Sequence, residues 1–197
     1  MAKHGQFTYM ARIKGDVICG GALITWRHVL TAAHCIVTTP STTRTVIKPK
    51  ARFRIHLGDH SKKKKDHNEE IRRVRQLVPH PTAWQNGQWV NDIGVIILQR
   101  AVTRFNPYIK PLWPNFCFVK QKPQNREDVT LTGWGYRQHP RKNENGASPT
   151  FPPDKLRVFE TSIAVCNNHT NTNFKDEFVC AFEKGRDVGF CQGDSGG

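Results

Sequence analysis

The chain has 197 residues, and its 30 Lys and Arg against 16 Asp and Glu give a formal net charge of +14. A chain of this length can bury a core without metals, and the excess of positive charge favours polyanions, acidic proteins or nucleic acid as partners without indicating a fold. No apolar stretch approaches the length needed to span a membrane, so a protein with spanning helices is not expected.

Short apolar or alternating runs recur between Gly, Pro, Asn and Lys residues. This pattern is typical of strands and shows little helical periodicity, so it predicts an all-β antiparallel barrel or sandwich. In chain order the runs are 5–13, 17–24, 28–33, 52–58, 93–98, 129–135, 155–165 and 177–182.

Polar loops separate these runs at 38–50, 60–70 and 136–153. Loops longer than about 12 residues in a compact domain are usually functional or mobile. We expect the first and third of them to be of this kind.

The cysteines have no CxxC pairing and no Cys/His spacing suited to a structural zinc site. They favour disulfides formed in an oxidising compartment. The N-terminal "MAKHGQFTYMARIKGD" has no apolar core of a signal peptide, so we expect the secreted chain to be incomplete. The six are Cys19, Cys35, Cys117, Cys166, Cys180 and Cys191.

Three segments supply the residue types of a nucleophilic serine site. A serine hydroxyl is a weak nucleophile, so it needs a histidine to take its proton and a carboxylate to orient that histidine. "LTAAHC" offers His34, "VNDIGVIIL" offers Asp92 and "CQGDSGG" offers Ser195. Singly they would suggest a surface histidine, a turn carboxylate and a tight turn, but together they predict catalysis.

A rival interpretation takes Gly193, Ser195 and Gly197 as the G-x-S-x-G motif of α/β-hydrolases. That fold needs the acid and the histidine after the serine. Here nothing follows the motif and the preceding context is all strand, so we reject it.

The ordered set "CGGALI", "LTAAHC", "NDIGVIIL", "TGWG" and "CQGDSGG" resembles the trypsin/chymotrypsin-like serine peptidases. The resemblance runs from about Gly5 to Gly197. It implies two antiparallel six-stranded β-barrels, the first over about 1–105 and a truncated second over about 106–197.

The resemblance implies a secreted serine endopeptidase, made as a zymogen, that cleaves proteins or peptides through an acyl-enzyme. His34 would be general base and then general acid, Asp92 would fix its tautomer, and Ser195 would attack the carbonyl. The backbone N–H groups of Gly193 and Ser195 would form the oxyanion hole. The alternative is a non-catalytic homologue that binds polyanions or acidic proteins.

Family members become active when a new N-terminal ammonium inserts beside the aspartate preceding the nucleophile, here Asp194. The resemblance implies that the chain begins just inside that terminus and ends before the last strands and helix of the family. We therefore expect the chain as given to be an inactive fragment, with Asp194 a buried carboxylate lacking its cation.

The resemblance also implies disulfides Cys19–Cys35 and Cys166–Cys180, and leaves Cys117 and Cys191 unassigned. Gly189 would form the floor of the specificity pocket and Phe190 its wall, which favours a small aliphatic P1 side chain. With an insertion in that loop, Asp187 would move inward and favour Lys or Arg.

The loop 60–70 aligns with the family's calcium loop, with Asp59, Asp66 and Glu69 as candidate ligands. Four lysines, 62–65, oppose a bound cation there, so a solvated basic loop is the default and no other cofactor is expected.

With Arg72, Arg73 and Arg75 the same lysines could form an anion-binding exosite, although a merely soluble surface is an equal alternative. No aromatic platform supports specific nucleic-acid binding. The oligomeric state is left open. Asn168 begins the glycosylation sequon "NHT".

Overall fold

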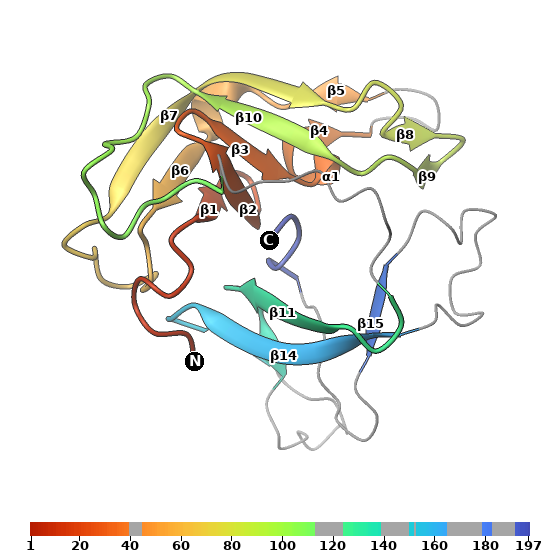
Figure 1. Ribbon diagram of the computed structural model, residues 1–197. Helices are drawn as coiled ribbons and strands as arrows, with labels where there is room; N and C mark the ends of the chain where they lie inside the picture. Colours follow the sequence, from red (N-terminus) through yellow and green to blue (C-terminus); the bar gives the residue numbers. More distant parts are fainter. Residues whose placement is uncertain (40–44, 113–123, 139–149, 152, 165–178, 183–191) are drawn as a thin grey trace.

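The computed structural model describes residues 1–39, 45–112, 124–138, 150–151, 153–164, 179–182 and 192–197 (Figure 1). The described residues are mostly strands. Their helical segments are one turn of α-helix, α1 (Ala33–Ile36), and one 3₁₀ turn, η1 (Lys50–Arg52). The prediction of an all-β fold is confirmed.

The first half of the chain forms a closed antiparallel barrel rather than a sandwich. Its strands, in the order in which they pair around the barrel, are β1 (Met10–Lys14), β2 (Ile18–Thr25), β3 (His28–Thr31), β10 (Gly94–Leu98), β7 (Glu70–Pro79) and β6 (Arg54–Leu57).

Alternating side chains build the barrel core. In β10, Gly94, Ile96 and Leu98 are buried while Val95 and Ile97 are half-buried, as expected where one face of a strand points inward. The same pattern buries Ile55 and Leu57 of β6. The barrel interior is therefore a packed hydrophobic core and leaves function to its rim and outer surface.

The described part of the second half is a three-stranded antiparallel sheet. It consists of β11 (Asp128–Gly133), β14 (Arg157–Ala164) and β15 (Cys180–Phe182). The division near residue 105 into two barrels stays a prediction for this half. Two-stranded ribbons complete the elements: β4 (Val37–Thr38) with β5 (Val46–Ile47), β8 (Trp84–Gln85) with β9 (Gln88–Trp89), and β12 (Arg137–Gln138) with β13 (Thr150–Phe151).

The segment 60–64 of the first half is hydrogen-bonded to the segment 154–156 of the second. Lys62 N–H donates to the Asp154 carbonyl at 2.8 Å, and Leu156 N–H donates to the His60 carbonyl at 2.9 Å. A second hydrophobic cluster lies beside these bonds and contains Ala2, Met10, Trp134 and Leu156. The two halves are thus joined by both backbone pairing and apolar contact.

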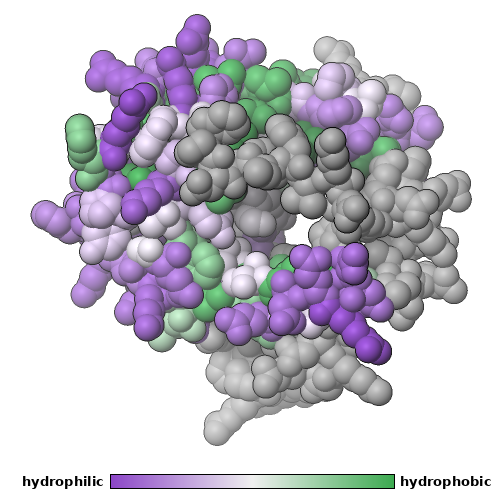
Figure 2. All heavy atoms as spheres, viewed as in Figure 1, coloured by the Kyte–Doolittle hydropathy of each residue, from purple (hydrophilic) through white to green (hydrophobic). Residues whose placement is uncertain are grey.

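The C-terminal segment 192–197 lies between the barrel and the β11–β14 sheet (Figure 1). Hydrophilic side chains cover much of the described surface in the same view (Figure 2). In the described part of the chain, no helix has the length and apolar character that crossing a membrane requires.

Candidate active site

His34 and Asp92 are joined by two hydrogen bonds although they stand 58 residues apart in sequence. His34 Nδ1 lies 2.7 Å from Asp92 Oδ2, and the His34 backbone N–H donates to Asp92 Oδ1 at 2.9 Å. Both carboxylate oxygens are therefore used to fix one residue. This leaves Nε2 of the imidazole for other partners.

The pKa of Asp92 lies below its ordinary value. Burial alone would raise this pKa, but the hydrogen bonds from the His34 side chain and backbone, the His34 charge and the Ala33 backbone outweigh it. Asp92 is thus an anion at neutral pH and can stabilise a positive charge on the imidazole.

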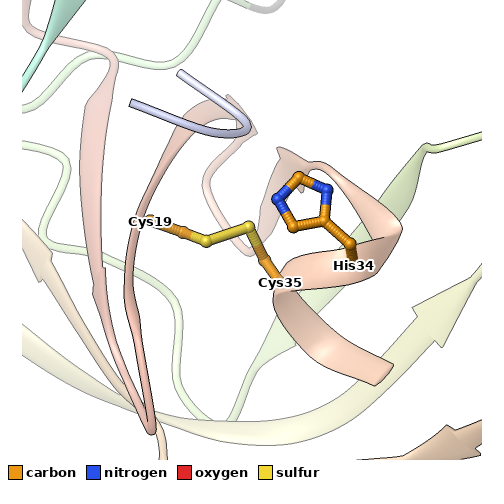
Figure 3. Close-up of side chains that lie close together, drawn as sticks. All are labelled: Cys19, His34 and Cys35. Carbon is orange, nitrogen blue, oxygen red and sulfur yellow. A yellow bond between two sulfur atoms is a disulfide. The ribbon is translucent and has the colours of Figure 1, made fainter. Parts of the chain in front are cut away.

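Three contacts hold the single turn of helix that carries His34. The disulfide Cys19–Cys35 joins this turn to β2 (Figure 3). The Lys48 ammonium donates to the carbonyls of His34 at 3.3 Å and Cys35 at 3.1 Å. A helix this short has no stability of its own, so these contacts position the histidine.

A tryptophan pair lies against His34. The ring of Trp89 is 5.8 Å from the His34 ring, edge to face, and 4.9 Å from that of Trp84. The two tryptophans face each other across a hairpin whose turn residues, Asn86 and Gly87, both have positive φ. Asn-Gly is the preferred sequence for such a turn, so "WQNGQW" is the signal that would have predicted this feature.

The segment around Ser195 packs against the residues that lead into His34. The Gly20 N–H donates to the Ser195 carbonyl at 2.8 Å, and the Cα of Gly196 fits so closely to Thr31 and Ala32 that a Cβ there would clash with both. The segment that carries the candidate nucleophile thus lies beside the residues that precede the candidate base. Among the described residues the Ser195 hydroxyl makes no hydrogen bond to His34, and such bonds often form only when substrate is bound.

Asp194 fits into a space left by the two glycines of "TGWG". Its Oδ1 accepts a hydrogen bond of 2.6 Å from the Gly135 N–H. A Cβ on either Gly133 or Gly135 would overlap the Asp194 carboxylate. The neighbouring Gly193 has φ +98°, a conformation that favours glycine. The motif thus has a steric role that the sequence did not show.

One peptide group links Asp194 to Lys62. The Lys62 ammonium donates to the Trp134 carbonyl at 3.0 Å, and the N–H of the same peptide, that of Gly135, donates to Asp194. Burial and Arg12 lower the pKa of Lys62, whereas Asp154, Asp194 and Asp59 oppose this shift. The peptide dipole has its negative end at the cation and its positive end at the carboxylate.

A family model and several known proteins match most or all of the chain. The trypsin family model covers residues 1–197. The chain belongs to the trypsin family. Homo sapiens kallikrein-15 is 31% identical over 191 residues, which are 93% of this chain and 66% of the relative. Homo sapiens kallikrein-8 is 31% identical over 200 residues, 98% of this chain and 66% of the relative.

Mus musculus vitamin K-dependent protein C is 26% identical over 200 residues, 100% of this chain and 41% of the relative. The chain thus spans about 66% of the length of these kallikreins. The resemblance to trypsin-like serine peptidases is confirmed. Such enzymes are hydrolases that act on protein or peptide substrates, and secretion and synthesis as a zymogen are typical of them.

The loop 60–70, which aligns with the family's calcium loop, has its candidate ligands engaged by other groups of the protein. Arg12 forms a buried ion pair with Asp59, and Glu69 is paired with His56. Asp66 instead accepts the backbone N–H groups of His60 and Ser61. Asp59 and Glu69 lie within 4.8 Å of each other, but Arg12 and His56 already pair with them, and Asp66 is used by backbone N–H groups. These residues do not fit a calcium cage of oxygen ligands.

The pKa values of Asp59 and His56 are both shifted by the burial of this cluster. Burial raises the pKa of Asp59 to about 6, although Arg12 opposes the shift. Burial lowers the pKa of His56, with Glu69 opposing and Arg12 adding to the effect. His56, Asp59 and Glu69 have ligand atoms within 4.8 Å of one another, but the guanidinium beside them supplies the positive charge.

Several predicted positions lie outside the described residues. These are Gly189, Phe190 and Asp187 of the specificity pocket, the sequon residue Asn168, and Cys117, Cys166 and Cys191. Cys180 is disulfide-bonded, and its pairing with Cys166 stays a prediction. The pair Cys19–Cys35 is confirmed.

Proposed function

We propose that the protein containing this chain is a serine endopeptidase that uses His34, Asp92 and Ser195. The observation that carries the proposal is the double hydrogen bond between Asp92 and His34, with the Ser195 segment packed beside the same helix turn. An oriented base near a serine is what nucleophilic catalysis by serine requires, so this arrangement supports the proposal.

In the first half of the proposed reaction, the Ser195 oxygen forms a bond to the scissile carbonyl carbon and its proton moves to His34 Nε2. The carbonyl oxygen becomes negative and accepts hydrogen bonds from the N–H groups of Gly193 and Ser195. The C–N bond then breaks, the amine takes the proton from His34, and an acyl ester remains on Ser195.

Water completes the cycle. His34 Nε2 removes a proton from the water as it attacks the ester, and returns that proton to the Ser195 oxygen as the acid product leaves. Asp92 stays ionised throughout and stabilises the imidazolium, in agreement with its low pKa.

We further propose an extracellular location, which the Cys19–Cys35 disulfide supports. We also propose activation from a zymogen, which is typical of the family. In the active form Asp194 would pair with a new N-terminal ammonium. For the pocket, Gly189 and Phe190 favour a small aliphatic P1 residue. The non-catalytic alternative is not favoured, because His34, Asp92 and Ser195 are all present.

A fluorophosphonate probe tests the activity of the whole protein after activation. We expect one probe per molecule, attached to Ser195, and none on Ser195→Ala. A folded, activated protein that takes up no probe would contradict the proposal and support the non-catalytic alternative.

A further inference from the structure

A basic hollow lies on the outer face of the barrel, where η1, β6 and β7 meet. Its volume is about 300 Å³, and four of its lining residues are basic: Lys50, Arg54, Arg73 and Arg75. The others are Ala51, Val74 and Gln99, so no acidic and no aromatic side chain lines it. We call these four residues and the space between them the arginine hollow.

Backbone pairing places two arginine residues opposite each other in neighbouring strands. Arg54 stands directly opposite Arg73 in the register of β6 and β7. Like charges opposite each other destabilise a sheet, and Arg75, two residues along the same strand, adds a third charge. The barrel therefore concentrates positive charge at a point where that charge does not stabilise the fold.

The walls of the hollow are fixed by bonds to the backbone. Arg54 Nη1 donates to the carbonyls of Ala51 at 2.9 Å and Phe53 at 2.8 Å, and the Lys50 ammonium donates to the Arg75 carbonyl at 3.0 Å. By contrast, within the described residues the side chains of Arg73 and Arg75 have no hydrogen-bond or ion-pair partner. Two guanidinium forks thus remain available to a ligand.

The other basic residues considered from sequence do not line the hollow. Arg72 is paired with Glu70, and Lys62 donates to the Trp134 carbonyl at 3.0 Å. Lys63 and Lys64 are exposed on the 60–64 segment, whose backbone N–H groups bond to Asp154 and Ser61. The structure therefore separates the lysine loop from the arginines.

We propose that the arginine hollow binds the sulfate groups of a sulfated polysaccharide. Guanidinium groups bind oxyanions through paired N–H donors. The hollow lacks the aromatic anchors that dominate protein interfaces and single-stranded nucleic-acid sites. Since the proposed location is extracellular, sulfated polysaccharides are the polyanions that the protein would meet. This inference does not depend on catalysis.

Heparin binding of the whole protein tests the proposal. The double variant Arg73→Ala/Arg75→Ala should raise the Kd by about tenfold or more at physiological salt, and should lower the salt slope of log K by about two, since two ionic contacts are lost. The matched control is Lys63→Ala/Lys64→Ala, which removes the same net charge. It should change the Kd by less than about twofold.

A second variant separates binding from folding. Arg73→Lys/Arg75→Lys keeps the charge but removes the guanidinium forks. Its Kd for heparin should lie between those of the wild type and the alanine variant, and its melting temperature should equal that of the wild type. Equal weakening by the two alanine variants would overturn the proposal, since binding would then follow net charge alone.

Competing polyanions decide the class of ligand. Fully desulfated heparin should not bind, and poly-glutamate and duplex DNA should bind more weakly than heparin and lose less affinity in the arginine variant. Tighter binding of poly-glutamate or of DNA through Arg73 and Arg75, or undiminished binding of desulfated heparin, would contradict the assignment to a sulfated polysaccharide.

Discussion

Asp92 uses both of its oxygens on His34, so the amide in Asp92→Asn should disturb the tautomer and orientation of the ring. We expect kcat to fall by about 10⁴-fold, as expected when the orienting carboxylate of such a triad is lost. The fold should persist, because the pair lies at the surface of the barrel with both side chains about one-third exposed. Steady-state kinetics with circular dichroism checks both points, and near-normal kcat would contradict the role.

The same carboxylate predicts a pH dependence of stability. The folded pKa of Asp92 is lowered, so its contribution is complete above the unfolded pKa of about 3.9 and is lost as pH falls through the lower folded value. Urea unfolding between pH 2 and pH 6 should show this loss in the wild type and a smaller one in Asp92→Asn. Identical profiles would contradict it.

Lys62 is predicted to position Asp194 through the Trp134–Gly135 peptide. Lys62→Met should lower stability by roughly 1.5–3 kcal/mol, the scale of a hydrogen bond to a charged group. It should also lower kcat more than it raises KM, because the Asp194 segment carries the proposed oxyanion donors. Lys62→Arg should rescue part of kcat. Lys63→Met, an exposed neighbour, is the control and should change neither quantity.

At the scale of elements, the β8–β9 hairpin places Trp89 beside His34, where it would meet substrate. Trp89→Ala should lower kcat/KM by roughly tenfold, about 1.4 kcal/mol, mainly through KM. Trp26, which precedes β3 whereas His34 follows it, is the control. Trp26→Phe should alter thermal stability but leave KM unchanged. An unchanged KM in the Trp89 variant would show that the hairpin does not contact substrate.

The apolar runs predicted the other five strands of the barrel but did not include β7, the longest strand in the described part of the chain, of which only the alternating arginines suggested a strand. Its inward residues Val74 and Leu77 are three apart instead of an even number apart, because the register with β10 shifts between Ile97 and Leu98. Arg73 and Arg75 are among its exposed residues. A bulge of this kind hides the period of two on which a strand prediction depends.

At the scale of the molecule, the ordered motifs predicted the family and the residue types of the site, whereas the supports of the site were not predictable. Lys48 and Lys62 look like ordinary basic loop residues in the sequence. Their roles depend on contacts made when distant segments meet, such as 60–64 with 154–156. The calcium-loop prediction missed Arg12 for the same reason, since it lies 47 residues from Asp59.

The net charge of the molecule does not show where its basic residues lie. A net charge of +14 predicts affinity for anions in general. The fold places Lys62 in the junction between the halves and Arg73 on an outer hollow. Two residues of equal charge, Lys62 and Arg73, thus have different roles in the molecule.

Trapping the covalent intermediate tests the central claim most directly. The activated whole protein is mixed with a nitrophenyl ester, quenched in acid and analysed by mass spectrometry. We predict one acyl group, located on Ser195, after a burst of nitrophenol, and no such adduct in Ser195→Ala or His34→Ala. Turnover without modification of Ser195, or an adduct of equal yield in His34→Ala, would contradict the account.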